Sequence, residues 1–215
     1  MKAVVYVDID DVLCETARQI MRLLNDRFGR TVRYEDITTF DLEVAFSLDV
    51  EQTRILSEIF HDPLVLTALE PVEGASAVLS RWREAGVEVD VVTGRPPVTD
   101  GPTREWLSVH QVPYDRLFYM DKFRRGNAWV PGTSILTADT LRDRPYAFAI
   151  DDAVPMVHFF AEHTSVPVVV YDRPWNRGCE DSVPVCTDAG VHRCRSWADI
   201  ECLVSDVLLP EMESV

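Results

Sequence analysis

The sequence predicts an α/β fold: a Rossmann-like parallel sheet with helices on both faces and a small helical cap inserted after the first strand. Short apolar runs alternate along the chain with longer segments of helical period. The first run, residues 3–9, has no polar alternation, which is typical of a strand covered on both faces. More than seventy residues separate it from the next run, far more than one crossover helix needs.

Five apolar runs are predicted to be strands, and amphipathic segments between them are predicted to be helices. The strands are expected at residues 3–9, 87–92, 116–120, 146–150 and 166–171. Helical faces are formed by Ala75, Val78, Leu79 and Trp82, by Met156, Phe159 and Phe160, and by Trp197, Ile200, Leu203, Val204 and Leu208.

The long insertion is predicted to be a cap. Its first helix presents an apolar face and ends at Gly29, and a second helix is expected over residues 55–60. We assign residues 15–70 to this cap, which we expect to act as a lid. Residues 1–14 and 71–215 are assigned to the Rossmann-like core domain.

Composition narrows the class of partner. The chain has 215 residues and a formal net charge of −15, so it is long enough for one core with an inserted subdomain. Such an acidic chain repels polyanions, which argues against a nucleic acid polymer or an anionic membrane as a partner. A small phosphate ester remains compatible, because one locally positive pocket with a cation can overcome the average field.

The sequence also favours a cytoplasmic location. The first apolar run is too short for a secretory signal, and no stretch has the length of a membrane span. The five cysteines include no close pair, so we interpret them as separate reduced thiols. The oligomeric state is left open, with a homodimer as one alternative.

Polar clusters follow three of the predicted strands. A lone Asp after a strand is commonly a turn former, but several carboxylates at one sheet edge repel each other and persist where a divalent cation neutralises them. Because the carboxyl ends of parallel strands meet at one edge, we expect these clusters to share a crevice. They are Asp8, Asp10 and Asp11, then Thr93-Gly94-Arg95, then Asp151-Asp152.

These residues resemble the motifs of the haloacid dehalogenase-like hydrolases. Asp8-Ile9-Asp10-Asp11-Val12 is similar to the first motif, Asp-x-Asp-x-Thr/Val. Val91–Arg95 resembles the second motif and Phe148–Asp152 the fourth. Their order and spacing agree with the family, and the insertion after the first motif resembles its first-position cap.

The resemblance implies a magnesium-dependent phosphomonoesterase with a covalent aspartyl-phosphate intermediate. Asp8 is then the nucleophile, and Asp10 is the general acid and base. The metal ligands are Asp8, Asp10 through its backbone carbonyl, and the pair Asp151 and Asp152.

The resemblance also implies a phosphate-binding set. The Thr93 hydroxyl and the Gly94 amide are expected to bind phosphoryl oxygens. The third motif is a lysine, and the chain has only Lys2 and Lys122. Lys122 follows the third predicted strand and is the better candidate, although it lies further before Asp151 than expected. The alternatives are an ordinary loop lysine, with the role taken by Arg95, Arg142 or Arg144.

Three further segments are similar to bacterial relatives of the cytosolic 5'(3')-deoxyribonucleotidases. They are Tyr34–Leu42, Tyr171–Arg177 and Arg195-Ser196-Trp197. The second motif departs from that subfamily, where Thr-Ser-Pro is expected in place of Thr93-Gly94-Arg95. The resemblance implies a 5'-nucleotidase acting on nucleoside or deoxynucleoside monophosphates.

Substrate contacts are predicted at Phe40 and Arg95. A base needs a flat apolar surface, which Tyr34, Phe40, Phe46 or Trp129 would provide; packing within the cap is the alternative for each. Three other functions compete with a nucleotidase. They are a broader phosphatase for sugar phosphates, a catalytically silent binding protein of the same fold, and a dehalogenase that shares the nucleophile.

Overall fold

A seven-stranded parallel sheet forms the centre of the structure, a computed structural model that describes residues 2–39, 41–122, 130–182 and 190–205. The strand order is β4-β3-β2-β1-β5-β6-β7, with every neighbouring pair parallel. The predicted fold class is confirmed. The strands are β1 Val4–Val7, β2 Glu88–Thr93, β3 Arg116–Met120, β4 Ile135–Leu136, β5 Tyr146–Asp151, β6 Val168–Tyr171 and β7 Val191–Cys194.

Each of the five predicted runs overlaps a strand, and the two edge strands β4 and β7 were not predicted. β4 has two residues, too few to give a periodic pattern. β7 reads Val-His-Arg-Cys and is only partly buried, so its sequence lacks the apolar run that marks the central strands.

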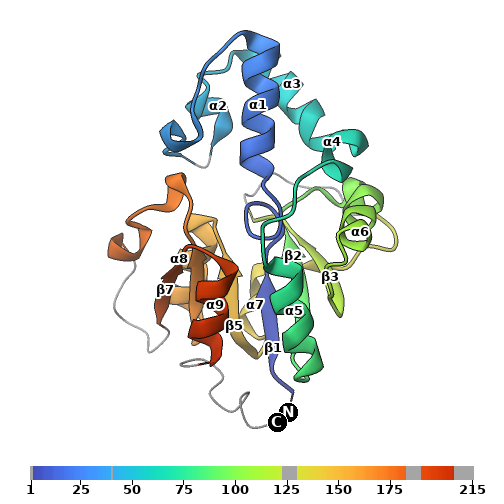
Figure 1. The fold of residues 1–215 in the computed structure, drawn as a ribbon, viewed down its shortest axis with the longest axis vertical. Helices are drawn as coiled ribbons and strands as arrows, with labels where there is room; N and C mark the ends of the chain where they lie inside the picture. The colour runs from blue at the N-terminus through green and yellow to red at the C-terminus, as the bar shows by residue number, and fades with distance from the viewer. Residues whose placement is uncertain (1, 40, 123–129, 183–189, 206–215) are drawn as a thin grey trace.

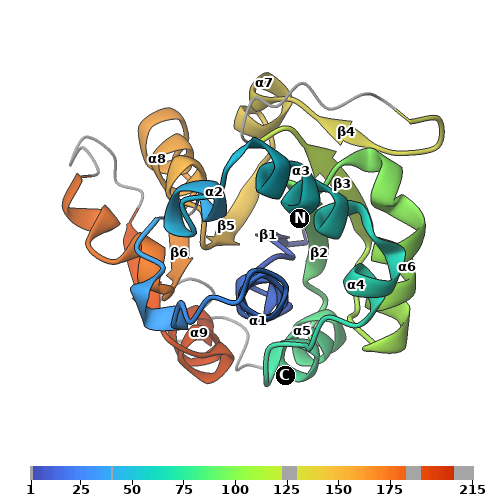
Figure 2. The same cartoon turned by 90° about the horizontal axis from the view of Figure 1, so that it is seen from above.

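Helices cover both faces of the sheet (Figure 2). One face packs against α5 Ala75–Glu84, α6 Asp100–Val109 and α9 Trp197–Leu203. The other packs against α7 Ala138–Arg142 and α8 Val154–His163. Successive residues of β1 are buried against opposite faces, with Val5 and Val7 on one and Tyr6 on the other. This double burial explains why the strand sequence does not alternate.

Four further helices stand over the carboxyl ends of the strands (Figure 1). They are α1 Thr16–Phe28, α2 Leu42–Ala45, α3 Val50–His61 and α4 Pro63–Thr67. Apolar side chains of α1, α2 and α3 meet in a separate cluster that includes Ile20, Leu24 and Leu56. α1 ends at Gly29 in the left-handed conformation, with φ of 60°. Short 3-10 turns complete the chain at η1 Tyr34–Asp36, η2 Pro97–Thr99, η3 Pro174–Asn176 and η4 Cys179–Ser182.

The chain enters and leaves this helical region side by side. The Glu15 amide donates to the Glu70 carbonyl at 2.9 Å, and the Val72 amide donates to the Leu13 carbonyl at 2.8 Å. The two connections therefore form a short paired stem. This pairing supports our proposal that residues 15–70 form the cap and residues 1–14 and 71–215 the core.

The packing of α5 on the sheet predicts a large difference between two leucines. Leu79 is fully buried in α5, whereas Leu64 in α4 is 79% exposed. Leu79→Ala is expected to lower the free energy of unfolding by about 2–5 kcal/mol, because it leaves a cavity in the core. Leu64→Ala is expected to change it by about 0.5 kcal/mol or less. Urea denaturation measures both, and similar values for the two variants would contradict the described packing.

Candidate active site

The loop after β1 is a tight turn. The amides of Leu13 and Cys14 donate to the Ile9 carbonyl at 2.8 and 3.1 Å, which turns the chain back on itself. Asp11 adopts φ of 59°, a left-handed conformation that Asp tolerates better than most residues. Its carboxylate accepts the Ala17 amide near the start of α1, at 3.1 Å from each oxygen. The turn fixes the backbone between Asp8 and the cap.

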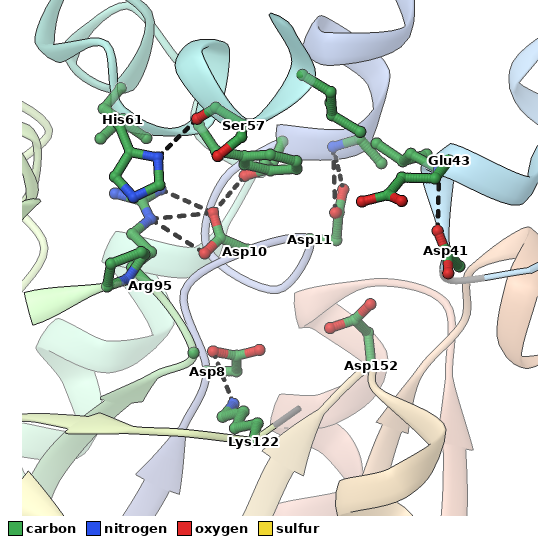
Figure 3. Close-up of a pocket in the computed structure, with 18 of the residues that line it drawn as sticks. Asp8, Asp10, Asp11, Asp41, Glu43, Ser57, His61, Arg95, Lys122 and Asp152 are labelled. Carbon is green, nitrogen blue, oxygen red and sulfur yellow. Dashed lines mark hydrogen bonds and ion pairs between the residues drawn. The ribbon is translucent and has the colours of Figure 1, made fainter. Parts of the chain in front are cut away.

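A pocket of about 350 Å³ lies between the strand ends and the cap (Figure 3). Its floor contains Asp8, Lys122 and Asp152, which come from β1, β3 and β5 or from the loops that follow them. Leu56 and Phe60 line it from the cap. The pocket therefore has a charged floor and a partly apolar roof, as expected for an ester with an organic leaving group.

A buried lysine bridges two carboxylates of the floor. Lys122 Nζ lies 2.9 Å from Asp8 Oδ1 and 2.8 Å from Asp151 Oδ2. Asp151 Oδ2 also accepts the Tyr6 hydroxyl at 2.8 Å, and its Oδ1 accepts the Ala153 amide at 2.9 Å. Both oxygens of Asp151 are thus engaged by protein donors.

Asp152 has one oxygen without a partner. Its Oδ2 accepts the Trp175 indole N–H at 2.8 Å, while its buried Oδ1 has no hydrogen-bond partner among the described residues. Carboxylate oxygens of Asp8, Asp151 and Asp152 lie within 4.8 Å of one another. A buried acceptor without a donor is costly, and clustered carboxylate oxygens are ligands that Mg²⁺ prefers. These residues fit a divalent cation.

The cluster contains more acidic groups than basic ones. Burial raises the pKa of Asp8, and neighbouring carboxylates raise it further. The charge of Lys122 lowers this pKa by a smaller amount than burial raises it. Burial and the nearby carboxylates of Asp11 and Asp151 also raise the pKa of Asp152. Burial lowers the pKa of Lys122, but Asp151 and Asp8 outweigh it, so the ammonium stays charged. One positive charge therefore faces three carboxylates of the cluster.

The Asp10 carboxylate is held by an arginine of the second motif (Figure 3). Arg95 Nε lies 3.0 Å from Asp10 Oδ2, its second terminal nitrogen lies 2.8 Å from Oδ1, and the Thr16 hydroxyl donates to Oδ1 at 2.6 Å. Burial raises the pKa of Asp10, but Arg95 and Thr16 outweigh it, so the net shift is downward. The Asp10 carboxylate is therefore held by Arg95 and Thr16, whereas Asp8 and Asp151 share Lys122.

The structure distinguishes the candidates for the third motif. Lys122 contacts Asp8 directly, whereas Arg142 pairs with Asp139 and Arg144 with Asp90. The reach of Lys122 depends on where β3 ends relative to β1, which sequence spacing alone did not show.

Of the other predicted phosphate-binding and substrate residues, Gly94 and Arg95 line the same pocket, and Thr93 precedes them in the chain. The Thr93 hydroxyl is buried at the end of β2 and accepts the Arg95 amide at 3.1 Å, and Gly94 lines the pocket. Arg95 also lines the pocket, although its guanidinium is engaged by Asp10.

The predicted aromatic surface differs from the one that the structure describes. Phe40 and Trp129 lie outside the described residues. Tyr34 and Phe46 are buried in the apolar cluster of the cap, which agrees with the packing alternative. Within the described ranges, the aromatic residues that line the pocket are instead Phe60 and Trp175. Trp175 could have been identified from the sequence, because it lies in a polar turn and a buried indole N–H needs a hydrogen-bond acceptor.

Comparison with known proteins places this chain in a family. The sequence model of the family described as "5' nucleotidase, deoxy (Pyrimidine), cytosolic type C protein" matches residues 2–129, more than half of the chain. The chain belongs to this nucleotidase family. A protein of Halalkalibacterium halodurans named "Putative nucleotidase BH1399" is 22% identical over 202 residues, which cover 94% of this chain and 92% of that protein.

Several solved structures have a fold similar to that of this chain. A predicted phosphatase from Clostridium acetobutylicum has a TM-score of 0.64 at 14% identity, covering 96% of this chain and 100% of that one. A phosphonoacetaldehyde hydrolase-like protein from Oleispira antarctica has 0.57 at 12%, covering 99% and 94%. A haloacid dehalogenase superfamily hydrolase from Ehrlichia chaffeensis has 0.51 at 15%, covering 96% and 98%. These TM-scores show a shared fold, at sequence identities that are low.

The chain is therefore a hydrolase, a phosphatase of the 5'-nucleotidase family, and its fold is shared with haloacid dehalogenase superfamily hydrolases. The resemblance drawn from the three motifs is confirmed. Among the described helices, none is long and apolar enough to cross a membrane.

The contacts of Lys122 predict that replacing either of the two lysines of this nucleotidase-family chain has a very different effect on its activity. Lys122→Met leaves Asp8 and Asp151 without their shared cation, so we expect kcat/KM for phosphate release to fall by about 10²-fold or more. Lys2→Met, at an exposed position, is expected to leave activity unchanged. Steady-state kinetics on both variants, with folding checked by circular dichroism, make the test. A folded Lys122→Met protein with full activity would contradict the assignment.

Proposed function

We propose that this chain is a magnesium-dependent phosphomonoesterase that acts on nucleoside or deoxynucleoside monophosphates through an aspartyl-phosphate at Asp8. The observation that carries the proposal is the setting of Asp8. One of its oxygens is engaged by Lys122 at 2.9 Å and by the Ile9 amide at 2.7 Å, at the floor of the pocket. Its other oxygen is left to attack phosphorus.

The chain's own residues account for both half-reactions. In the first, an Asp8 oxygen bonds to phosphorus, the ester P–O bond breaks, and Asp10 gives a proton to the leaving oxygen. That step requires the Asp10 contact with Arg95 to loosen. In the second, Asp10 takes a proton from water, whose oxygen bonds to phosphorus and releases phosphate and free Asp8. Lys122 supplies positive charge beside the phosphoryl oxygens in both steps.

The carboxylate cluster supports a place for Mg²⁺. Asp8, Asp152 and the Asp10 carbonyl would hold the ion directly. Asp152 Oδ1 has no hydrogen-bond partner in the described part of the chain, while both oxygens of Asp151 are already engaged. When bound, Mg²⁺ neutralises charge that would otherwise keep an anionic nucleophile from an anionic ester.

The shape of the pocket supports a mononucleotide. A volume of about 350 Å³ suits a small molecule, and the net charge of −15 opposes a polymer. Phe60 and Trp175 offer flat surfaces to a base, and Ser57 and His61 bring polar groups from the cap (Figure 3). A sugar-phosphate substrate is the competing proposal. The expected cytoplasmic location and a homodimer remain predictions.

Replacement of the nucleophile gives the first test of this proposal. Asp8→Asn keeps the shape of the side chain but removes the attacking carboxylate, so turnover is expected to fall by about 10³-fold or more. Asp139→Asn is the matched control, because this exposed carboxylate pairs only with Arg142 in the contacts of α7. A malachite-green assay of released phosphate with Mg²⁺ measures both variants. A folded Asp8→Asn protein with near-normal turnover would refute the nucleophile assignment.

Phe60 gives a test of the substrate class. Base stacking contributes about 1–3 kcal/mol, so Phe60→Ala is expected to lower kcat/KM for nucleoside monophosphates by about tenfold. The same variant is expected to change rates with sugar phosphates, which lack a base, by less than about threefold. A panel of both substrate classes, run on wild type and variant, measures this. Equal wild-type rates on the two classes would favour the broader phosphatase.

A further inference from the structure

The turn after β6, at Pro174–Asn176, is hydrogen-bonded to the acidic loop after β5. Asn176, which is 1% exposed, donates its side-chain amide to the Asp152 carbonyl at 2.9 Å and to the Tyr171 carbonyl at 2.8 Å. Its side-chain oxygen accepts the Arg173 amide at 3.1 Å and an Arg193 nitrogen at 2.8 Å. A side chain with this many buried contacts holds the turn in one position.

The same turn also reaches the nucleophile loop and the cap. Arg173 is buried and donates Nε to the Asp11 carbonyl at 2.7 Å. Its terminal nitrogens lie 3.3–3.4 Å from the Glu15 carboxylate, where the chain enters the cap, and one donates to the Tyr34 hydroxyl at 3.3 Å. The turn is therefore tied to three parts of the site.

Trp175 lies at the centre of this turn. Its indole N–H donates to Asp152 Oδ2 at 2.8 Å, and its ring packs edge-on against Tyr34 with centroids 5.8 Å apart. Asp152 is thereby left with Oδ1, the buried oxygen that has no hydrogen-bond partner among the described residues. The carboxylate is therefore held through Oδ2, and one of its oxygens lies within 4.8 Å of carboxylate oxygens of Asp8 and Asp151.

We propose that Trp175 is a positioning residue for the metal: its indole N–H holds the Asp152 carboxylate so that Oδ1 is available to a divalent cation. Hydrogen bonds of this kind fix the orientation of a ligating carboxylate and its affinity for the ion. The edge contact with Tyr34 links that orientation to the cap. The inference rests on the proposed function, because it takes Asp152 as a metal ligand.

A matched pair of Trp→Phe variants tests this role. Trp175→Phe keeps an aromatic ring at the pocket wall but removes the N–H, so the effect is separable from stacking on a substrate. Trp106→Phe removes the same kind of bond elsewhere, since the fully buried Trp106 donates Nε1 to the Leu69 carbonyl at 2.7 Å. Mn²⁺ binding, followed by the electron paramagnetic resonance signal of the free ion, is measured without substrate. We expect a dissociation constant about tenfold higher for Trp175→Phe and within about twofold of wild type for Trp106→Phe.

The outcomes separate this inference from the proposed function. Absence of Mn²⁺ binding by the wild-type protein would sink the metal-dependent function itself. If the wild type binds and Trp175→Phe binds equally well, only the positioning role falls. An equal loss in Trp106→Phe would also overturn it, because the effect would then be general destabilisation.

A measurement on the wild-type protein covers the case in which Trp175→Phe does not fold. In ¹H–¹⁵N spectra, the indole signal of Trp175 is identified through its proximity to the Tyr34 ring. Addition of Mg²⁺ is expected to shift this signal and to leave that of Trp106 in place. An unmoved Trp175 indole at saturating Mg²⁺ would overturn the proposal.

Discussion

The site depends on one ammonium group buried between carboxylates at the ends of two neighbouring strands. Lys122 Nζ contacts Asp8 and Asp151 at 2.9 and 2.8 Å, and Asp152 lies in the same cluster. Removal of these acids from water is costly, and a single lysine offsets only part of their charge. A divalent ion would neutralise the remaining negative charge. The clustered carboxylates are therefore the source both of the electrostatic cost and of the proposed metal-dependent chemistry.

The order of the strands brings these groups together. β1 lies between β2 and β5, so Asp8 emerges beside the Thr93 end of one neighbour and the Asp151 end of the other. β3 adds Lys122 from the next position along the sheet. The paired stem holds the cap over this edge of the sheet, and side chains of the cap line the pocket from the opposite side. A parallel sheet with one insertion thus separates the groups proposed for chemistry, on the core, from those proposed for substrate contact, on the cap.

Sequence patterns were sufficient for the central strands because successive residues such as Val5 and Tyr6 are fully buried although they point to opposite faces. They failed for β7, whose side chains are partly exposed. The acids at strand ends were also recognisable, since a parallel sheet places all such ends at one edge. Lys122 was a candidate partner of Asp8 through the family resemblance alone, and the indole donor of Asp152 was not predicted. Both contacts depend on how far a loop carries Lys122 or Trp175 across the sheet. A local sequence pattern does not specify the distance that a loop spans across the sheet.

The central claim is that the carboxylates gathered at the ends of β1 and β5 hold one divalent ion beside the nucleophile. Anomalous diffraction from crystals of the wild-type protein grown with Mn²⁺ tests it most directly. The account predicts a single strong peak in contact with carboxylate oxygens of Asp8 and Asp152, with Lys122 still against Asp8. A cluster that stays free of Mn²⁺ at millimolar concentration, or a peak bound elsewhere on the chain, would contradict it.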